Sequence, residues 1–158
     1  MRGRTIALPL LILFLGFPSR ADAPPFHYNS FDTNSTTIRD SKTRLTWQRP
    51  PTSTSAVKQT YAAAEAYCAT ALPSGRVPTV KELQTLVDEQ PHVTGGIRRY
   101  IDGNAFPADR LSVSAPYWSS SKQRTDGTQY TVKFDTGETS TLGRDDQTVV
   151  LCVSGPSP

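Results

Sequence analysis

Apolar residues recur at helical spacing in the middle of the chain, between residues 56 and 72. They fall at positions i, i+4, i+7 and i+11 and would line one buried face: Val57, Tyr61, Ala64 and Cys68. Ser55 stands where its side chain can cap the first turn, and Pro73 and Gly75 interrupt the pattern at its other end. The pattern predicts a helix from residue 56 to about residue 72, with Ser55 as its N-cap.

A second, shorter apolar stripe follows a capping box. In Thr79-Val-Lys-Glu82 the Thr79 hydroxyl can accept a hydrogen bond from the third backbone N–H of a helix, while the Glu82 carboxylate reaches back to the cap. We therefore expect a helix from Thr79 to about Gln90, ended by Pro91. Four apolar residues would be buried on one side of it: Val80, Leu83, Leu86 and Val87.

Short apolar or alternating segments predict strands on both sides of these helices. Residues 37–48 indicate a small hairpin whose apolar face would carry Ile38, Leu45 and Trp47. The last third of the chain is expected to be β-structure. Its strands would be residues 117–121, a half-buried strand at Tyr130, Val132 and Phe134, a return strand at 139–142, and an apolar central strand at 148–153.

A long stretch separates the second helix from these strands. Residues 91–116 show little periodicity, and we expect one long irregular loop there, of a length usually found in functional loops. The order of hairpin, two helices, loop and antiparallel strands predicts an α+β fold, with two helices packed on small antiparallel β-sheets.

The N-terminal residues have the pattern of an export signal. Two arginines precede an apolar run, residues 6–17, which is shorter than the ~20 residues that a membrane-crossing helix needs. We expect cleavage after Ala21, with cleavage after Ala23 and an uncleaved anchor as the alternatives. The cleaved protein would be exported and without a stable membrane anchor. The expected parts are a signal peptide, a flexible lead-in, one domain and a tail: residues 1–21, 22–35, 36–154 and 155–158.

Export places the two cysteines in an oxidising compartment. Cys68 and Cys152 are the only two in the sequence, so we expect one structural disulfide, joining the first helix to the last strand. In the chain-entropy model, closing a loop of this size is worth roughly 4–5 kcal/mol. A metal site is less favoured because it needs three or four ligands at set spacing, and His27 and His92 are scattered.

Charge and motif content exclude two classes of function. Three of the 17 basic residues lie in the predicted signal peptide, so the remaining 14 balance the 14 acidic residues. A nucleic-acid partner is not expected, because such binding needs a basic surface that replaces phosphate counterions. The serines of Ser119-Ser-Ser121 lack a Gly-x-Ser-x-Gly elbow, and no enzymatic activity is expected.

Several motifs follow one another in a fixed order along the mature chain. They are a hairpin with Asp40, Leu45 and Trp47; Tyr67-Cys68; Arg76-Val-Pro-Thr-Val-Lys-Glu-Leu83; Ile101-Asp102 with Ala105-Phe106-Pro107; Tyr117-Trp-Ser-Ser-Ser121; and Val150-Leu-Cys-Val153. Together, over residues 37–153, they resemble the Lcl C-terminal domain family. The resemblance implies a C-type lectin-like fold in a secreted or surface bacterial protein, with a disulfide from the first helix to the last strand. It also implies, for the adhesin module of that family, an association with sulfated polysaccharides.

The chain departs from the expected patterns at two places. The turn glycine of the opening hairpin is replaced by Arg44, so a residue that adopts left-handed backbone easily is lost there. Calcium-binding lectins of this fold carry an acidic or amide residue after the proline that corresponds to Pro91, and Trp-Asn-Asp in place of Trp118-Ser-Ser. His92 follows Pro91 here, and calcium-dependent sugar binding is not expected.

The candidate ligand site lies in the long loop and the strand that follows it. Its residues are Arg98, Arg99, Tyr100, Arg110 and Trp118. Guanidinium forks match sulfate and carboxylate oxygens, and an aromatic ring can pack on a sugar face. In the alternative, the loop arginines pair with Asp102 and Asp109, and Trp47 and Trp118 are core residues.

The sequence therefore predicts an exported, non-enzymatic binding module for an anionic polysaccharide, another glycan or a surface protein. The alternative is a structural or interaction subunit of a surface assembly that binds no glycan. No cofactor and no metal are expected, and oligomerisation stays open.

Overall fold

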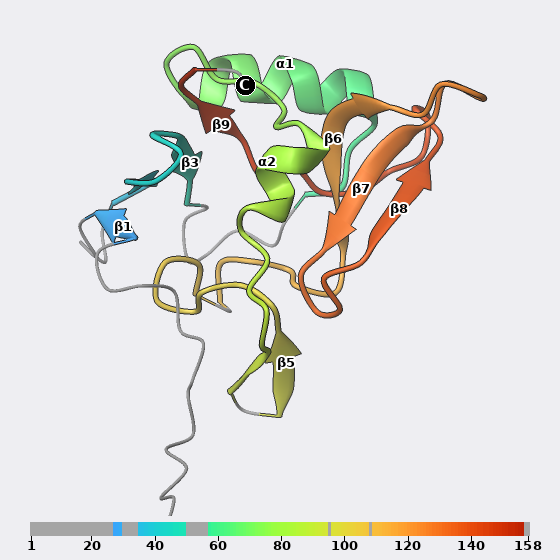
Figure 1. Ribbon diagram of the computed structural model, residues 1–158. Helices are drawn as coiled ribbons and strands as arrows, with labels where there is room; N and C mark the ends of the chain where they lie inside the picture. Colours follow the sequence, from blue (N-terminus) through green and yellow to red (C-terminus); the bar gives the residue numbers. More distant parts are fainter. Residues whose placement is uncertain (1–26, 30–34, 50–56, 95, 108, 157–158) are drawn as a thin grey trace, which may run out of the picture.

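A computed structural model describes residues 27–29, 35–49, 57–94, 96–107 and 109–156 (Figure 1). The predicted signal peptide, the linker at residues 50–55 and the proposed cap Ser55 lie outside the described residues. Two short helices and three small antiparallel sheets make up the described part, which confirms the α+β class. No described helix is both long and apolar enough to cross a membrane.

The first sheet joins the two ends of the domain. Its strands are β1 (Tyr28–Asn29), β2 (Thr37–Asp40), β3 (Thr46–Gln48) and β9 (Val153–Ser154), all antiparallel and in the order β1-β2-β3-β9. The predicted hairpin is therefore confirmed, with Ile38 opposite Trp47 and both side chains buried. The predicted flexible lead-in was wrong at β1, because Tyr28 is buried and its ring meets Phe106 edge to face.

Helix α1 (Tyr61–Ala71) begins later than predicted. The chain before it is extended, because Gln59 and Thr148 exchange backbone hydrogen bonds of 2.8 and 3.1 Å. Thr60 is the N-cap, accepting from the Ala63 N–H at 3.4 Å, and Val57 is exposed rather than part of the buried stripe. The other three stripe residues are buried as predicted: Tyr61, Ala64 and Cys68.

Helix α2 (Val80–Gln84) has the predicted capping box but ends six residues earlier than expected. The Thr85 hydroxyl donates to the Glu82 carbonyl at 2.7 Å, and the Asp88 N–H donates to the Tyr100 carbonyl at 3.0 Å. Leu86 and Val87 still donate to carbonyls three residues back, at 3.0 and 3.1 Å, and from Asp88 onward the chain pairs with a distant segment instead of continuing the helix. Leu86 is nevertheless buried, as the pattern required.

The predicted long loop is interrupted by a hairpin of β4 (His92–Thr94) and β5 (Ile97–Arg99), which projects from the body of the domain at the end opposite α1 (Figure 1). Residues 100–115 contain no strand or helix, apart from the undescribed residue 108. They are held to the core by buried apolar side chains: Ile101, Ala105, Phe106, Leu111 and Val113.

The third sheet consists of β6 (Pro116–Lys122), β7 (Gln129–Lys133) and β8 (Thr139–Leu142), in that order, as predicted. The apolar segment at 148–153 was expected to be a central strand, and this was wrong. It crosses between the sheets and makes single bridges, with Val149 beside Tyr117 and Val153 beside Arg76. Val149, Leu151, Cys152 and Val153 are buried and Val150 is half-buried. Each neighbour along residues 148–152 belongs to a different element, so no regular ladder forms before β9.

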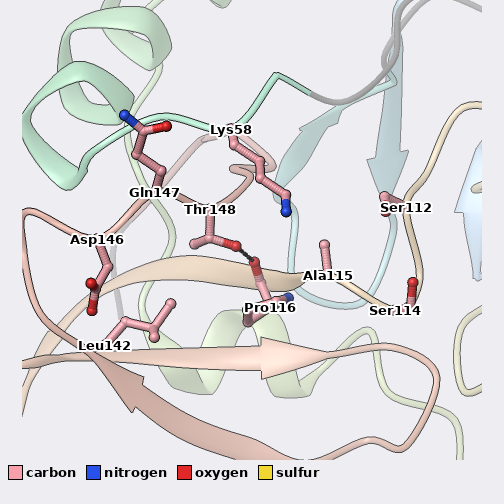
Figure 2. A pocket seen from close by; sticks show the side chains of 9 residues that line it. All are labelled: Lys58, Ser112, Ser114, Ala115, Pro116, Leu142, Asp146, Gln147 and Thr148. Carbon is pink, nitrogen blue, oxygen red and sulfur yellow. Dashed lines mark hydrogen bonds between the residues drawn. The ribbon is translucent and has the colours of Figure 1, made fainter.

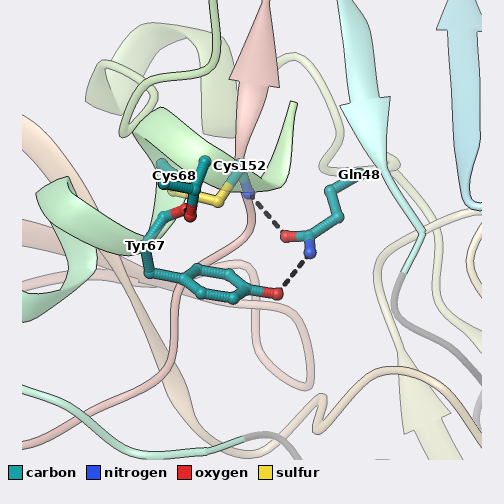
Figure 3. The surroundings of a disulfide bond; sticks show 5 residues. Gln48, Tyr67, Cys68 and Cys152 are labelled. Carbon is teal, nitrogen blue, oxygen red and sulfur yellow. Dashed lines mark hydrogen bonds between the residues drawn. A yellow bond between two sulfur atoms is a disulfide. The ribbon is translucent and has the colours of Figure 1, made fainter. Parts of the chain in front are cut away.

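The predicted disulfide is present between Cys68 of α1 and Cys152, directly before β9. Both cysteines are fully buried. Gln48 of β3 supports the bridge, since its side-chain amide donates to the Tyr67 hydroxyl and its carbonyl oxygen accepts from the Cys152 N–H at 3.5 Å (Figure 3). Three segments that are distant in sequence therefore meet around the disulfide: β3, α1 and the chain entering β9.

Candidate functional site

The structure separates the residues of the predicted site. Arg98 is exposed on β5, whereas only 3% of the neighbouring Arg99 is exposed. Trp118 is fully buried, and its indole N–H donates to the Gln59 carbonyl at 2.9 Å. Trp118 therefore offers no ring face to a ligand, and neither does the fully buried Trp47. For both tryptophans, the core alternative holds.

The two other predicted residues are partly covered. Tyr100 is half-buried, and its backbone N–H donates to the Phe134 carbonyl at 2.6 Å. Arg110 is half-buried and engaged with the rest of the chain. Asp102 accepts from two backbone N–H groups, those of Asn104 at 2.7 Å and Ala105 at 3.2 Å. Of the predicted site residues, Arg98 alone is classed as exposed.

Arg98 borders an open depression of about 550 Å³, here called the Arg98 depression. It is lined by Ile97, Arg98, Leu111, Ser112, Val113, Ser114 and Asp135. The Asp135 Oδ1 atom is buried and accepts no hydrogen bond from any described residue. The depression thus places one guanidinium near one carboxylate, of which the Oδ1 atom is shielded from solvent.

A second open depression of about 500 Å³, here called the Lys58 depression, adjoins the first. It is lined by Lys58, Ser112, Ser114, Ala115, Pro116, Leu142, Asp146, Gln147 and Thr148. Figure 2 shows the Lys58 side chain extending over its middle, with Ser112 and Ser114 on one side and Asp146 on the other. Because both depressions include Ser112 and Ser114, they meet at these two residues.

Local sequence explains why the serines face outward. In residues 111–115 the buried Leu111 and Val113 alternate with Ser112 and Ser114, which puts the hydroxyls on the side away from the core. Two backbone N–H groups, those of residues 134 and 135, donate to the Val113 carbonyl at 3.1 and 3.0 Å and fix the segment against the end of β7.

The Lys58 side of the site is held by a short polar contact. The Thr148 hydroxyl donates to the Pro116 carbonyl, which ties the start of β6 to the crossing segment (Figure 2). Asp146 Oδ2 accepts from the Gly143 N–H at 2.8 Å, so the turn after β8 is fixed as well. Asp145 and Asp146 thus lie in a turn.

Sequence reasoning missed most of these residues. Lys58 was assigned to the interior of a helix, and the actual pairing of Gln59 with Thr148 could not be read from either local sequence. The alternation around Ser112 and Ser114 was the one usable signal, since a strict apolar–polar pattern in a supposed loop indicates one buried and one exposed side.

Two contacts between a histidine and a carboxylate lie near β1 and β4. His27 Nε2 is 3.2 Å from Asp40 Oδ1, and His92 Nε2 is 3.2 Å from Asp88 Oδ2. Burial raises the pKa of Asp88, although the adjacent His92 opposes the shift. Within the described ranges, no group of three or more His, Cys, Asp or Glu residues is arranged to hold a metal ion.

Comparison with known proteins gives one match. The family model described as the Lcl C-terminal domain matches residues 36–154, which is most of the chain. The match includes both described helices and every described strand except β1. No curated protein and no solved structure matches the chain.

Proposed function

The chain belongs to the Lcl C-terminal domain family, and from this premise we propose that it is an exported, non-enzymatic module that binds an acidic extracellular polysaccharide. The observation that carries the proposal is the pair of adjoining open depressions, each lined by hydroxyls, one basic and one acidic side chain. Sugars present hydroxyl groups that donate to carboxylates, and sulfate or carboxylate substituents accept from guanidinium and ammonium groups.

We further propose a C-type lectin-like fold. Three features support it: the helix-to-last-strand disulfide of Cys68 and Cys152, the pairing of β3 with the C-terminal strand β9, and the long stretch between α2 and β6 that borders the candidate site. The disulfide is also consistent with export, since such bonds persist in oxidising compartments.

The test is binding of the folded protein to heparin, as an acidic polysaccharide, and to dextran, as a neutral one. We expect binding to heparin alone, weaker at higher salt because exposed ion pairs are screened, and unchanged by EDTA. Arg98→Ala should weaken it severalfold. Arg124→Ala is the matched control, because Arg124 is equally exposed but lies in the turn at the far end of β6. Equal losses in the two variants, or no binding to heparin at all, would contradict the proposal, and loss of binding in EDTA would reveal a metal requirement.

One observation favours the alternative of an interaction subunit. The β4–β5 hairpin carries two exposed apolar side chains, Val93 at 65% and Ile97 at 50% exposure. Val93 is opposite Arg98 and Ile97 is opposite Thr94, so the two side chains lie on opposite faces of the hairpin, and a partner chain would have to contact both faces to cover them. If no polysaccharide on a glycan array binds, with or without calcium, this alternative gains and the proposed function fails.

A further inference from the structure

We propose that the two depressions act as consecutive subsites for one linear ligand, so that the protein recognises an internal stretch of a polymer with an acidic group in successive units. This inference rests on the proposed function and specifies the ligand further. It places one acidic unit at Arg98 and the next at Lys58, with the linkage between them over Ser112 and Ser114.

The first support is that the same chemistry occurs twice. Arg98 and Asp135 stand in one depression, and Lys58 and Asp146 stand in the other. Neither Lys58 nor Arg98 takes part in an ion pair within the described part of the chain. A protein surface that repeats one basic and one acidic group matches a ligand that repeats one acidic group and several hydroxyls.

The second support is the boundary between the depressions. Ser112 and Ser114 belong to both linings, so no bulky side chain has to be displaced for a ligand to pass from one to the other. Hydroxyls can donate to and accept from sugar oxygens in several arrangements. Both depressions are open to solvent, so a polymer can enter and leave without presenting a chain end.

The third support is energetic. A single exposed ion pair strengthens binding by no more than about fivefold, which is too little for useful binding by either depression alone. When two weak subsites take neighbouring units of one chain, the second contact is intramolecular and the affinity rises without any new type of contact. The arrangement therefore favours long ligands over short ones.

The experiment uses heparin fragments of defined length, from disaccharide to octasaccharide, titrated into the folded protein by calorimetry. For the unchanged protein we expect the affinity per fragment to rise about tenfold or more once a fragment reaches both subsites. In Lys58→Ala and in Arg98→Ala this step should disappear. Only a shallow rise in affinity with fragment length should remain, because a longer fragment offers more positions at which one subsite can bind it. Arg124→Ala should retain the step, and melting curves check that all variants are folded.

The outcomes separate the inference from the proposed function. Binding that does not depend on fragment length, or a length step that survives Lys58→Ala while Arg98→Ala weakens all fragments, overturns the two-subsite inference alone. Failure of every fragment to bind the unchanged protein overturns the proposed function and the inference together.

Discussion

Arg44 holds a backbone conformation that a side chain opposes, and its replacement should stabilise the domain. It stands in the turn between β2 and β3 with φ = 62°, in the left-handed region, where the family pattern has glycine. Left-handed backbone costs a residue with a Cβ about 1–2 kcal/mol. Glycine avoids this cost, but it makes the unfolded chain more flexible, and this offsets about 0.5–1 kcal/mol of the gain in stability. Arg44→Gly should therefore raise the free energy of unfolding by about 0.5–1 kcal/mol.

The rest of the turn should not change. Asp40 holds it with its side chain, which accepts from the backbone N–H groups of Lys42 at 2.7 Å and Thr43 at 3.2 Å. The Asp40 N–H also donates to the Leu45 carbonyl at 2.8 Å. The Arg44 side chain is exposed and forms no hydrogen bond or ion pair with the described residues, so its removal breaks no contact.

Thermal melts and urea titrations measure the effect, which corresponds to about 2–4 °C in Tm for a domain of this size. Arg44→Ala is the first control, because it removes the same charge but keeps the Cβ. Lys42→Gly is the second, because Lys42 lies in the same turn at negative φ and should lose stability. An equal gain from Arg44→Ala would refute the reasoning, since the strain would then not be the cause, and so would the absence of any gain from Arg44→Gly.

Three more predictions concern the core. Alkylation of the denatured, unreduced protein should add no alkyl group, because Cys68 and Cys152 are joined, and two alkylated thiols in protein purified under oxidising conditions would contradict the disulfide. Leu83→Asp should unfold the domain, because Leu83 is fully buried and an unpaired buried carboxylate costs several kcal/mol against a total of about 5–15 kcal/mol; an unchanged melting curve would contradict the packing of α2. Burial opposes ionisation of Glu82, but hydrogen bonds from Arg76 and Thr79, together with the charge of Arg76, outweigh it and lower the pKa of Glu82 below its ordinary value of 4.5. The stability from these contacts is therefore present above about pH 4.5 and is lost as pH falls below it. Arg76→Met should flatten that loss in an acid titration of the melting temperature, and an unchanged slope would show that another group is responsible.

The features that the sequence predicted well are those with local causes. The capping box of Thr79 and Glu82 lies within four residues, and the alternation around Ile38 and Trp47 lies within one hairpin. The disulfide could be predicted without geometry, because the expected export left the two cysteines of the sequence with one partner each. These signals sufficed for the α+β class, the hairpin, the third sheet and the bridge.

The features that failed depend on contacts between distant segments. The start of α1 is set by the pairing of Gln59 with Thr148, and the end of α2 by the hydrogen bond from Asp88 to Tyr100. For Trp118 the sequence does not reveal burial, because a tryptophan with a ligand and one in a core look alike along the chain. Of the charged residues in the candidate site, the sequence pointed only to Arg98. The other half of the site comes from the segment around Lys58, which was predicted to be helical.

The pairing of β3 with β9 also determines when the fold can be completed during synthesis. Synthesis proceeds from the N-terminus, so the hairpin of β2 and β3, the helix α1 and the thiol of Cys68 all exist before their partners have been made. Cys152 completes the bridge and Val153 completes the first sheet, and both come later in the chain than α1 and β3, to which they are joined. Until they emerge, Trp47 lacks its cross-strand partner Val153, and Cys68 on the buried face of α1 lacks its disulfide partner. The segment from Cys152 to Ser154 therefore acts as the closing step of folding, and a chain stopped before it is left with an incomplete first sheet and an unpaired thiol.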